Sequence, residues 1–338
     1  MGRQNAQLRR TVVQALFFGA LMCLRFTDMS ALAQARITEN YPAAPVKVIV
    51  PKAPGGPVDT FARLLATQLE KHWKQPVVVD DRAGAGGTIG TAAVAKAVPD
   101  GYTLLVTDVT SQVTAPLLMQ PRPYDSVADF EPVVLAARSL LVLVINNDLP
   151  VRNLNDLVTY GRSHAGELNY SSAATGGFAH LTMALLLNRL GLSMQHVPYR
   201  GGAPALLAAV TGEVQMNIAD LASALPQMRA GKVRPLVQIG VTRSPLLSDV
   251  PTVTEAGVRD FDGTYWLGVL APPGTPKAIV EKLNSDVNEA LHAPEIREYA
   301  TKSGTELAGG SPETFKQVIR VDQRTWSAVI RDNNIRAE

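Results

Sequence analysis

Cysteine is almost absent from this chain of 338 residues. The single cysteine, Cys23, lies in an N-terminal segment with a basic start, an apolar centre and small residues before position 34, which is the pattern of a secretory signal peptide. We predict that residues 1–33 are this signal peptide and that cleavage follows Ala33. The mature chain then has no thiol, which excludes disulfides, thiolate catalysis and cysteine metal sites.

A membrane anchor is the alternative reading of the same segment. Its apolar run, "TVVQALFFGALMCL", is shorter than the roughly 20 residues that a spanning helix needs. The sequence therefore favours export over anchoring in the membrane.

Charged and aromatic residues are also sparse, at 18% and 6% of the chain. Cleavage after Ala33 removes four arginines and one aspartate, which changes the formal net charge from +2 to −1. No basic field remains for nucleic acid or a membrane surface, so we expect neither as a partner. The 46% of apolar residues suffices for about two domains, and the few aromatics among many Ala, Val and Leu favour an α/β protein.

Known enzyme motifs are missing as well. The segment "GAGGTIG" has Ile89 where the dinucleotide-binding fingerprint requires its third glycine, and the only Gly-Lys pair, at 231 and 232, lacks the remaining Walker residues. No GxSxG motif occurs, and the five histidines show no metal-binding spacing such as HExxH. The sequence therefore predicts no cofactor and no metal ion.

One catalytic arrangement is left for the fold to decide. A triad of Ser171 or Ser172 with His180 and Asp220 requires the tertiary structure to bring these residues together. His180 lies in the apolar segment "FAHLTMALLL", where a histidine is more often structural. We predict no catalytic residue and a protein that is not an enzyme.

Strand-like and helix-like segments alternate along the mature chain at the spacing of βαβ units. The apolar run 132–146 is too long for one ordinary strand and has no polar face for a surface helix. We interpret it as two consecutive strands that carry the chain from one domain into another. We predict further strands at 46–50, 76–81, 103–107, 168–172, 195–199, 213–219, 233–240 and 264–272, and helices at 58–73, 88–97, 153–162, 177–190, 203–211, 222–230, 276–291, 294–302 and 312–332.

This pattern predicts two doubly wound α/β domains joined by two crossover strands, with a ligand cleft between them. Domain 1 comprises residues 34–138 and 262–338, and domain 2 comprises residues 139–261. Gly-Gly pairs between a strand and the next helix recur at 55–56, 86–87, 176–177 and 201–202. Ligands of open α/β sheets bind where such helices begin, so the four turns are expected to line one cleft. For any single pair, a glycine needed only for a tight turn is an equally good reading.

Several longer motifs follow one another along the mature chain. They include "PGGPVDTFARLLA", "QPVVVDDRAGAGGTIGTAAVAKAVPDGYTLL", "LNYSSAATGGFAHL", "HVPYRGGAPALLAAVTGEVQM" and "DVPTVTEAG". With these motifs the chain resembles the Bug family of periplasmic solute receptors, which serve tripartite tricarboxylate transporters. The resemblance covers almost the whole mature chain. It implies a two-lobed, type II-like periplasmic binding protein that closes on a small carboxylate, either an organic acid or an amino acid.

The resemblance also implies partners, and one alternative function stands beside it. The expected partners are the small carboxylate and the membrane subunits of the transporter, and the receptor is expected to be a monomer. The alternative function is a ligand sensor that presents its bound solute to a membrane signalling partner.

Candidate ligand-binding residues follow from the glycine turns and from the family's binding loops. The amides of Gly55, Gly56 and Val58 precede the first hydrogen bond of a predicted helix, although Asp59 is expected to cap that helix itself. Asp220 either orients an amino or hydroxyl group of the solute or caps the following helix. The candidates are Lys52, Pro54, Gly55, Gly56, Val58 and Asp108 in domain 1, and Ser171, Ser172, Ala173, Thr175, Gly176, Tyr199, Gly201, Ala203 and Asp220 in domain 2.

Two of these candidates depart from the family pattern. Lys52 stands where the family commonly has an aromatic residue, and Asp108 stands in a loop that usually carries small polar residues. A lysine favours a more acidic solute and an aspartate favours an amine, unless the two residues pair with each other. Lys52 is therefore the first position to change in a test of what the receptor selects.

Overall fold

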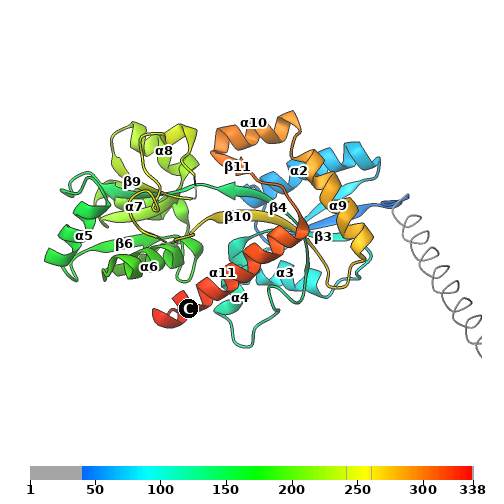
Figure 1. The fold of residues 1–338 in the computed structure, drawn as a ribbon, viewed down its shortest axis with the longest axis horizontal. Coiled ribbons are helices and arrows are strands. Elements are labelled where there is room, and N and C mark those ends of the chain that lie inside the picture. The colour runs from blue at the N-terminus through cyan, green and yellow to red at the C-terminus, as the bar shows by residue number, and fades with distance from the viewer. Residues whose placement is uncertain (1–39, 241, 260, 337–338) are drawn as a thin grey trace, which may run out of the picture.

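Two mixed sheets, each covered by helices, make up the two lobes of this computed structural model (Figure 1). It describes residues 40–240, 242–259 and 261–336, and the predicted signal peptide 1–33 lies outside the described residues. The predicted two-lobed α/β fold is confirmed.

The first lobe is built on a six-stranded sheet with the order β11-β4-β10-β3-β1-β2. Strand β1 is parallel to β2 and β3, whereas β10 is antiparallel to both β3 and β4. The strands are β1 (Val46–Val50), β2 (Val77–Asp81), β3 (Thr103–Asp108), β4 (Glu131–Ser139), β10 (Tyr265–Ala271) and β11 (Thr305–Leu307), and the helices are α2 (Pro57–Trp73), η1 (Ala85–Gly87), α3 (Thr88–Ala95), η2 (Thr110–Thr114), α4 (Ala115–Leu117), α9 (Lys277–Ala290), α10 (Pro294–Ser303) and α11 (Pro312–Asp332).

The second lobe is built on a five-stranded sheet with the order β7-β6-β8-β5-β9. Strand β6 is parallel to β7 and β8, whereas β5 is antiparallel to β8 and β9. The strands are β5 (Leu141–Asn146), β6 (Asn169–Ser172), β7 (Gln195–Pro198), β8 (Met216–Asp220) and β9 (Val233–Ile239), and the helices are α5 (Leu154–Ser163), α6 (Phe178–Leu190), α7 (Gly202–Thr211), α8 (Leu221–Arg229) and η3 (Pro245–Leu247).

The apolar run 132–146 forms two consecutive strands, as predicted. Strand β4 ends in the first sheet at Ser139 and β5 begins in the second sheet at Leu141, so that Leu140 alone separates the two lobes. Residues 132–137 and 141–146 are all buried, because helices cover both faces of each sheet. Strand β10 brings the chain back and therefore runs antiparallel to β4. The alternation of strands and helices did not predict this direction.

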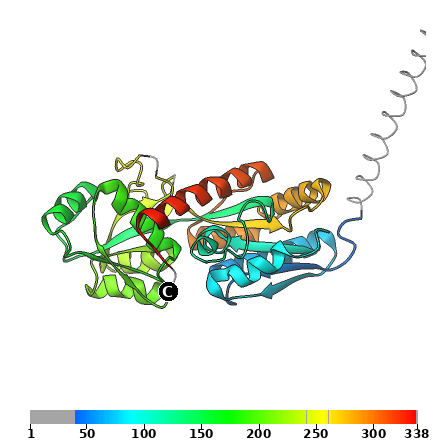
Figure 2. The same cartoon turned by 90° about the horizontal axis from the view of Figure 1, so that it is seen from below.

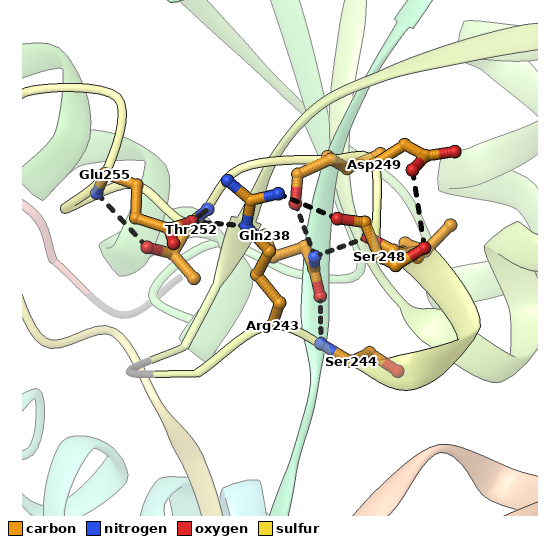
Figure 3. Close-up of polar contacts among 9 residues, drawn as sticks. Gln238, Arg243, Ser244, Ser248, Asp249, Thr252 and Glu255 are labelled. Carbon is orange, nitrogen blue, oxygen red and sulfur yellow. Dashed lines mark hydrogen bonds and ion pairs between the residues drawn. The ribbon is translucent and has the colours of Figure 1, made fainter.

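The return segment between β9 and β10 is held to β9 by side-chain hydrogen bonds (Figure 3) as well as by a backbone bridge between Gln238 and Thr252. The Gln238 amide donates to the carbonyl oxygens of Leu247 at 2.9 Å and Val250 at 2.6 Å, and it accepts from the Ser244 N–H at 2.8 Å. The Glu255 carboxylate accepts from Arg243 Nε at 2.7 Å. The motif "DVPTVTEAG" therefore stabilises the second crossover.

The C-terminal helix α11 extends along both lobes (Figures 1 and 2). In the first lobe, the Phe315 ring packs against Trp266 of β10 at 5.1 Å between ring centroids. Towards the second lobe, Trp326 packs against Phe178 of α6 at 5.0 Å. Asp322 lies between these contacts and accepts a 2.6 Å hydrogen bond from Trp266 Nε1.

We expect Asp322→Asn to stabilise the protein at pH 8 and to have little effect at pH 4.5. Burial, with the nearby charge of Asp262 adding to it, raises the pKa of Asp322 to about 7. The native state therefore keeps a proton that the unfolded state loses above about pH 4, so this carboxyl lowers the stability progressively as the pH rises to 7. At about 1.4 kcal/mol per pKa unit, the penalty at pH 8 reaches about 4 kcal/mol. Thermal unfolding should show a melting temperature several degrees higher for the variant at pH 8.

The matched control is Asp332→Asn at the exposed end of the same helix, where the carboxylate pairs with Arg331. A surface pair contributes little, so this variant should melt like the wild type at both pH values. A melting temperature of Asp322→Asn that differs from the wild type equally at both pH values would show that Asp322 is ionised in the native state throughout.

Candidate functional site

A cavity of about 440 Å³ lies between the lobes, at the point where β4 passes into β5. The crossover contributes Ser139, Leu140 and Leu141 to its wall. From the first lobe the wall contains Pro57, Thr110, Tyr265, Tyr299, Ser303 and Thr305, and from the second lobe it contains Ala173, Ala174, Gly177, Phe178, Ala179, Gly202, Ala205 and the consecutive residues 217–223. The wall is thus made largely of helix starts and strand ends.

The start of α6 opens onto this cavity. The Leu181 N–H donates to the Gly177 carbonyl at 3.0 Å, so the amides of Phe178 and Ala179 precede the first helical hydrogen bond. The N-cap residue, Gly177, has no side chain that could cap this helix. Both amides belong to residues of the cavity wall, and together with the positive end of the helix they favour an anion.

The start of α7 lies beside it. The Ala205 N–H donates to the Gly201 carbonyl at 3.3 Å, which leaves the Gly202 amide at the cavity wall, and the N-cap residue Gly201 has no side chain that could cap α7. The carbonyl of Ala173 accepts from the Gly201 N–H at 3.1 Å, and the carbonyl of Ala174 accepts from the Gly177 N–H at 3.2 Å. Residues 173–174 therefore hold the two helix starts side by side.

The start of α8 is already satisfied. The Asp220 carboxylate accepts from the Ser223 N–H at 2.8 Å, and the Leu221 N–H donates to the Leu140 carbonyl at 3.0 Å. Asp220 thus caps its helix, which is one of the two roles the sequence left open. Its side chain is nevertheless exposed and lies in the cavity wall, so a contact with the solute remains a prediction.

The glycine turn before α2 has less to offer an anion than its sequence indicates. The Gly55 N–H donates to Asp59 at 2.7 Å, and Asp59 also pairs with Arg63 at 2.6 Å. As expected, Asp59 is engaged at the start of its own helix, where it takes up the Gly55 amide of the preceding turn. Gly56 is the N-cap residue, the Val58 side chain is buried in the core, and Pro57 is the residue of this turn that reaches the cavity.

Pro54 and the glycine pair at 86–87 of the first lobe also lie away from the cavity wall. Pro54 is exposed in the turn before α2. The pair at 86–87 packs inside the lobe, where a Cβ on Gly87 would lie 2.1 Å from Ser111 Oγ. This turn is glycine-rich because of close packing. The four glycine turns therefore do not all line the cavity: Gly177 and Gly202 belong to its wall, whereas neither glycine of the pairs at 55–56 and 86–87 does.

The hydroxyls of Ser171 and Ser172 point into the second lobe. Ser171 Oγ donates to the Ala205 carbonyl at 2.7 Å, and Ser172 Oγ lies 2.7 Å from His196 Nε2. Both serines are about 1% exposed. Successive residues of a strand face opposite sides, and both hydroxyls are used internally, Ser171 towards α7 and Ser172 towards His196 of β7. They hold the loop 173–177 in place.

His180 fixes the same loop from the side of α6. Its Nδ1 accepts the Gly176 N–H at 2.9 Å, and its ring stacks on His196 at 3.7 Å. Burial, together with the charge of His196, lowers the pKa of His180 to about 4, so the ring stays neutral and able to accept. The Ser-His-Asp triad is not assembled, because Ser172 contacts His196 and Asp220 caps α8.

The remaining candidates surround the two helix starts without lining the cavity. Gly176 has a φ of +70° and lies against Leu118, where a Cβ would clash. The Tyr199 N–H donates to the Ser172 carbonyl at 2.9 Å. Thr175 is half-buried, and Ala203 is exposed on the first turn of α7. Of the predicted residues, Ala173 and Asp220 belong to the cavity wall.

Lys52 and Asp108 pair with each other. Lys52 Nζ lies 3.0 Å from Asp108 Oδ2, and the side chain of Asp108 is fully buried. Asp108 is the last residue of β3 rather than a loop residue, and it also accepts from the Tyr265 hydroxyl and from the Ser111 N–H. Burial opposes ionisation, but Lys52 and these donors outweigh it and hold the pKa of Asp108 below its usual range.

The aromatic side of the cavity was missed by the sequence analysis. Tyr265 at the start of β10, Tyr299 of α10 and Phe178 of α6 all line it, as does Thr110 at the start of η2. The Phe178 and Tyr265 rings meet edge to face at 5.4 Å. Gly177 and Gly202 could have been predicted from the sequence, because each is the second glycine of a pair whose first glycine was a predicted site residue. No sequence pattern indicates the two tyrosines, because the return strand β10 and α10 approach the cleft only in the tertiary structure.

A second cavity, of about 480 Å³, lies between the return segment and α10. Two arginines border it, but Arg243 is engaged by Glu255 and by the Ser248 carbonyl. We assign the site to the 440 Å³ cavity because the starts of α6 and α7 open there.

The fold and the cleft together define a class of protein. Two α/β lobes joined by two crossovers, with glycine N-capped helix starts facing a cavity between them, are the architecture of a solute-binding receptor. No helix among the described residues is long and apolar enough to cross a membrane.

The sequence itself matches a family model, that of the tripartite tricarboxylate transporter family receptor, over residues 61–335. The chain therefore belongs to this family, and the resemblance to the Bug receptors is confirmed. It is a receptor rather than an enzyme. The chain is 38% identical over 318 residues to a protein of the tcbD-tcbE intergenic region of Pseudomonas sp. strain P51, covering 94% of each chain. It is 35% identical to protein BugT of Bordetella pertussis over 91% of this chain and 94% of BugT.

Solved structures agree with the sequence relatives. A Rhodopseudomonas palustris protein described with adipate is 34% identical, covers 88% of this chain and 100% of its own, and superimposes with a TM-score of 0.73. MatC of the same species, described with bound malate, is 34% identical over 86% of this chain and 100% of its own, with a TM-score of 0.71.

Proposed function

We propose that this protein captures a small carboxylate in the cleft between its lobes and delivers it to the membrane subunits of a tripartite tricarboxylate-type transporter. The observation that carries the proposal is the pair of helix starts with glycine N-caps, α6 and α7, whose first residues line one cavity. Hydrogen bonds from such amides to a carboxylate are worth roughly 1.5 to 3 kcal/mol each before ordering costs. The similar structures described with adipate and malate support this class of ligand.

The remaining parts of the proposal concern the state of the receptor. It acts in the periplasm as a monomer after cleavage at Ala33. The lobes comprise residues 34–138 with 262–338, and residues 139–261. The distribution of the strands between the two sheets supports these boundaries. The family is one of transporter receptors, so transport is preferred to sensing.

A thermal-shift screen of the mature receptor tests the function. Purified protein, stripped of ligand by unfolding and refolding, is melted with organic acids and amino acids, and hits are measured by calorimetry. A ligand that binds only the native state adds about 2.7 kcal/mol of stability at a hundredfold excess over its Kd. Amines and neutral sugars of similar size are the controls. The proposal fails if no carboxylate raises the melting temperature.

A further inference from the structure

The cavity wall carries one charged side chain, and that charge is negative. Among the described residues that line the cavity, Asp220 is the only Asp, Glu, Lys, Arg or His. Lys52, the cation among the predicted ligand-binding residues, is paired with the buried Asp108. Burial raises the pKa of Tyr299, and the charge of Asp220 raises it further, so the field of Asp220 extends across the cleft.

This charge becomes costly when the lobes enclose a ligand. In the open cleft Asp220 is exposed, with one oxygen bonded to the Ser223 N–H and the carboxylate facing water. Enclosing a carboxylate beside it would put two anions in a dry site, and a buried charge without a partner is strongly unfavourable. Because the wall offers no cation, the compensating group has to come with the ligand.

A second acceptor lies three residues away on the same strand. The Asn217 Nδ2 donates to the Ser171 carbonyl at 3.1 Å. A carbonyl oxygen only accepts, so this contact fixes which end of the amide is nitrogen. Asn217 is 2% exposed and lines the cavity, and its Oδ1 has no hydrogen-bond partner within the described part of the chain. An unpaired buried acceptor in the same cavity wall also favours a ligand that brings a donor.

We propose, building on the carboxylate-binding function above, that the ligand is an α-amino acid with an apolar side chain. Its carboxylate lies at the starts of α6 and α7, and its ammonium lies at Asp220. The side chain packs against the rest of the wall, which is made of Leu140, Phe178, Tyr265 and several alanines. A second carboxylate, as in a dicarboxylic acid, would meet no cation there.

Three acids with one carbon skeleton test this assignment. L-Leucine, 2-hydroxy-4-methylpentanoate and 4-methylpentanoate differ only in the group on C2, which is ammonium, hydroxyl or hydrogen. Calorimetry should show leucine binding about ten- to hundredfold tighter than 4-methylpentanoate, because a charge-assisted hydrogen bond separates them. The hydroxy acid should lie between them. Phenylalanine and 3-phenylpropanoate repeat the comparison for a larger side chain.

The variant Asp220→Asn shows whether Asp220 makes the distinction. Asparagine caps helices about as well as aspartate, so the variant should melt like the wild type while binding leucine and 4-methylpentanoate within about threefold of each other. Asp125→Asn is the matched control, since Asp125 caps a turn outside the cavity by accepting from the N–H groups of Val127 and Ala128. This control should keep the wild-type preference.

The outcomes separate the inference from the function on which it rests. Equal binding of leucine and 4-methylpentanoate by the wild type, or tighter binding of adipate than of either amino acid, overturns the amino-acid assignment and leaves carboxylate capture intact. A preference for leucine that survives in Asp220→Asn overturns the role of Asp220. If no carboxylate of any kind binds, the proposed function itself fails.

Discussion

Replacing Lys52 by methionine is expected to lower the free energy of unfolding by about 3 kcal/mol at pH 8, because removing one partner leaves a buried charge unpaired. The Asp108 side chain is fully buried, and Lys52 is its one cationic partner among the described residues. The loss should be smaller at pH 5, where a carboxyl deprived of Lys52 takes up a proton. Urea unfolding of the ligand-free protein at both pH values measures the difference.

The double variant Lys52→Met with Asp108→Asn is the control. It removes the unpaired charge, while the asparagine can still hydrogen-bond the Tyr265 hydroxyl and the Ser111 amide. It should recover most of the lost stability at pH 8. A single variant as stable as the wild type would mean that the pair contributes nothing to folding and that Lys52 is free for a ligand.

Replacing Ala179 by aspartate is expected to weaken carboxylate binding at least about a hundredfold. Ala179 is the second residue of α6 and lies in the cavity wall. A carboxylate at this position takes the amides that the solute would use and repels the solute, and two charge-assisted hydrogen bonds are worth roughly 3 kcal/mol or more. Calorimetry with the best ligand of the thermal-shift screen measures the loss.

Asparagine at the same position separates charge from size. Ala179→Asn adds the same number of atoms without the charge and should weaken binding only about tenfold. Aspartate in a first turn stabilises a helix by about 0.3 to 1 kcal/mol, so Ala179→Asp should melt no lower than Ala179→Asn. Equal affinities of the two variants would show that the carboxylate does not lie at the start of α6.

Much of the fold could be predicted because the signals are local. The apolar face of α2 and the glycine turns before α6 and α7 can be recognised from residues that are close together in the sequence. The predicted helix boundaries agree with the structure within a few residues. The two consecutive strands at 132–146 were recognised from length and apolarity alone. Strand direction was not, since β10 runs antiparallel only because it returns from the second lobe.

The site could be predicted only in part. Helix starts indicate where an anion fits, but whether their amides are free depends on single side chains. Asp59 takes up the Gly55 amide before α2 with a charged carboxylate, whereas the corresponding Gly176 amide before α6 is taken up by the neutral His180 ring, and the N-cap residues of α6 and α7 are glycines. The serines after β6 looked like ligand donors, and the structure turns their hydroxyls inward to Ala205 and His196.

The sequence by itself determined the two α/β lobes, the glycine turns and the receptor family, because periodicity and motif spacing act over short stretches of chain. Only the tertiary structure decided which turns reach the cleft, and it paired Lys52 with Asp108 across 56 positions of sequence. It also brought Tyr265 and Tyr299 to the same cavity wall as Pro57. Such contacts depend on the return of the chain through β10 and α10, and no local pattern records them.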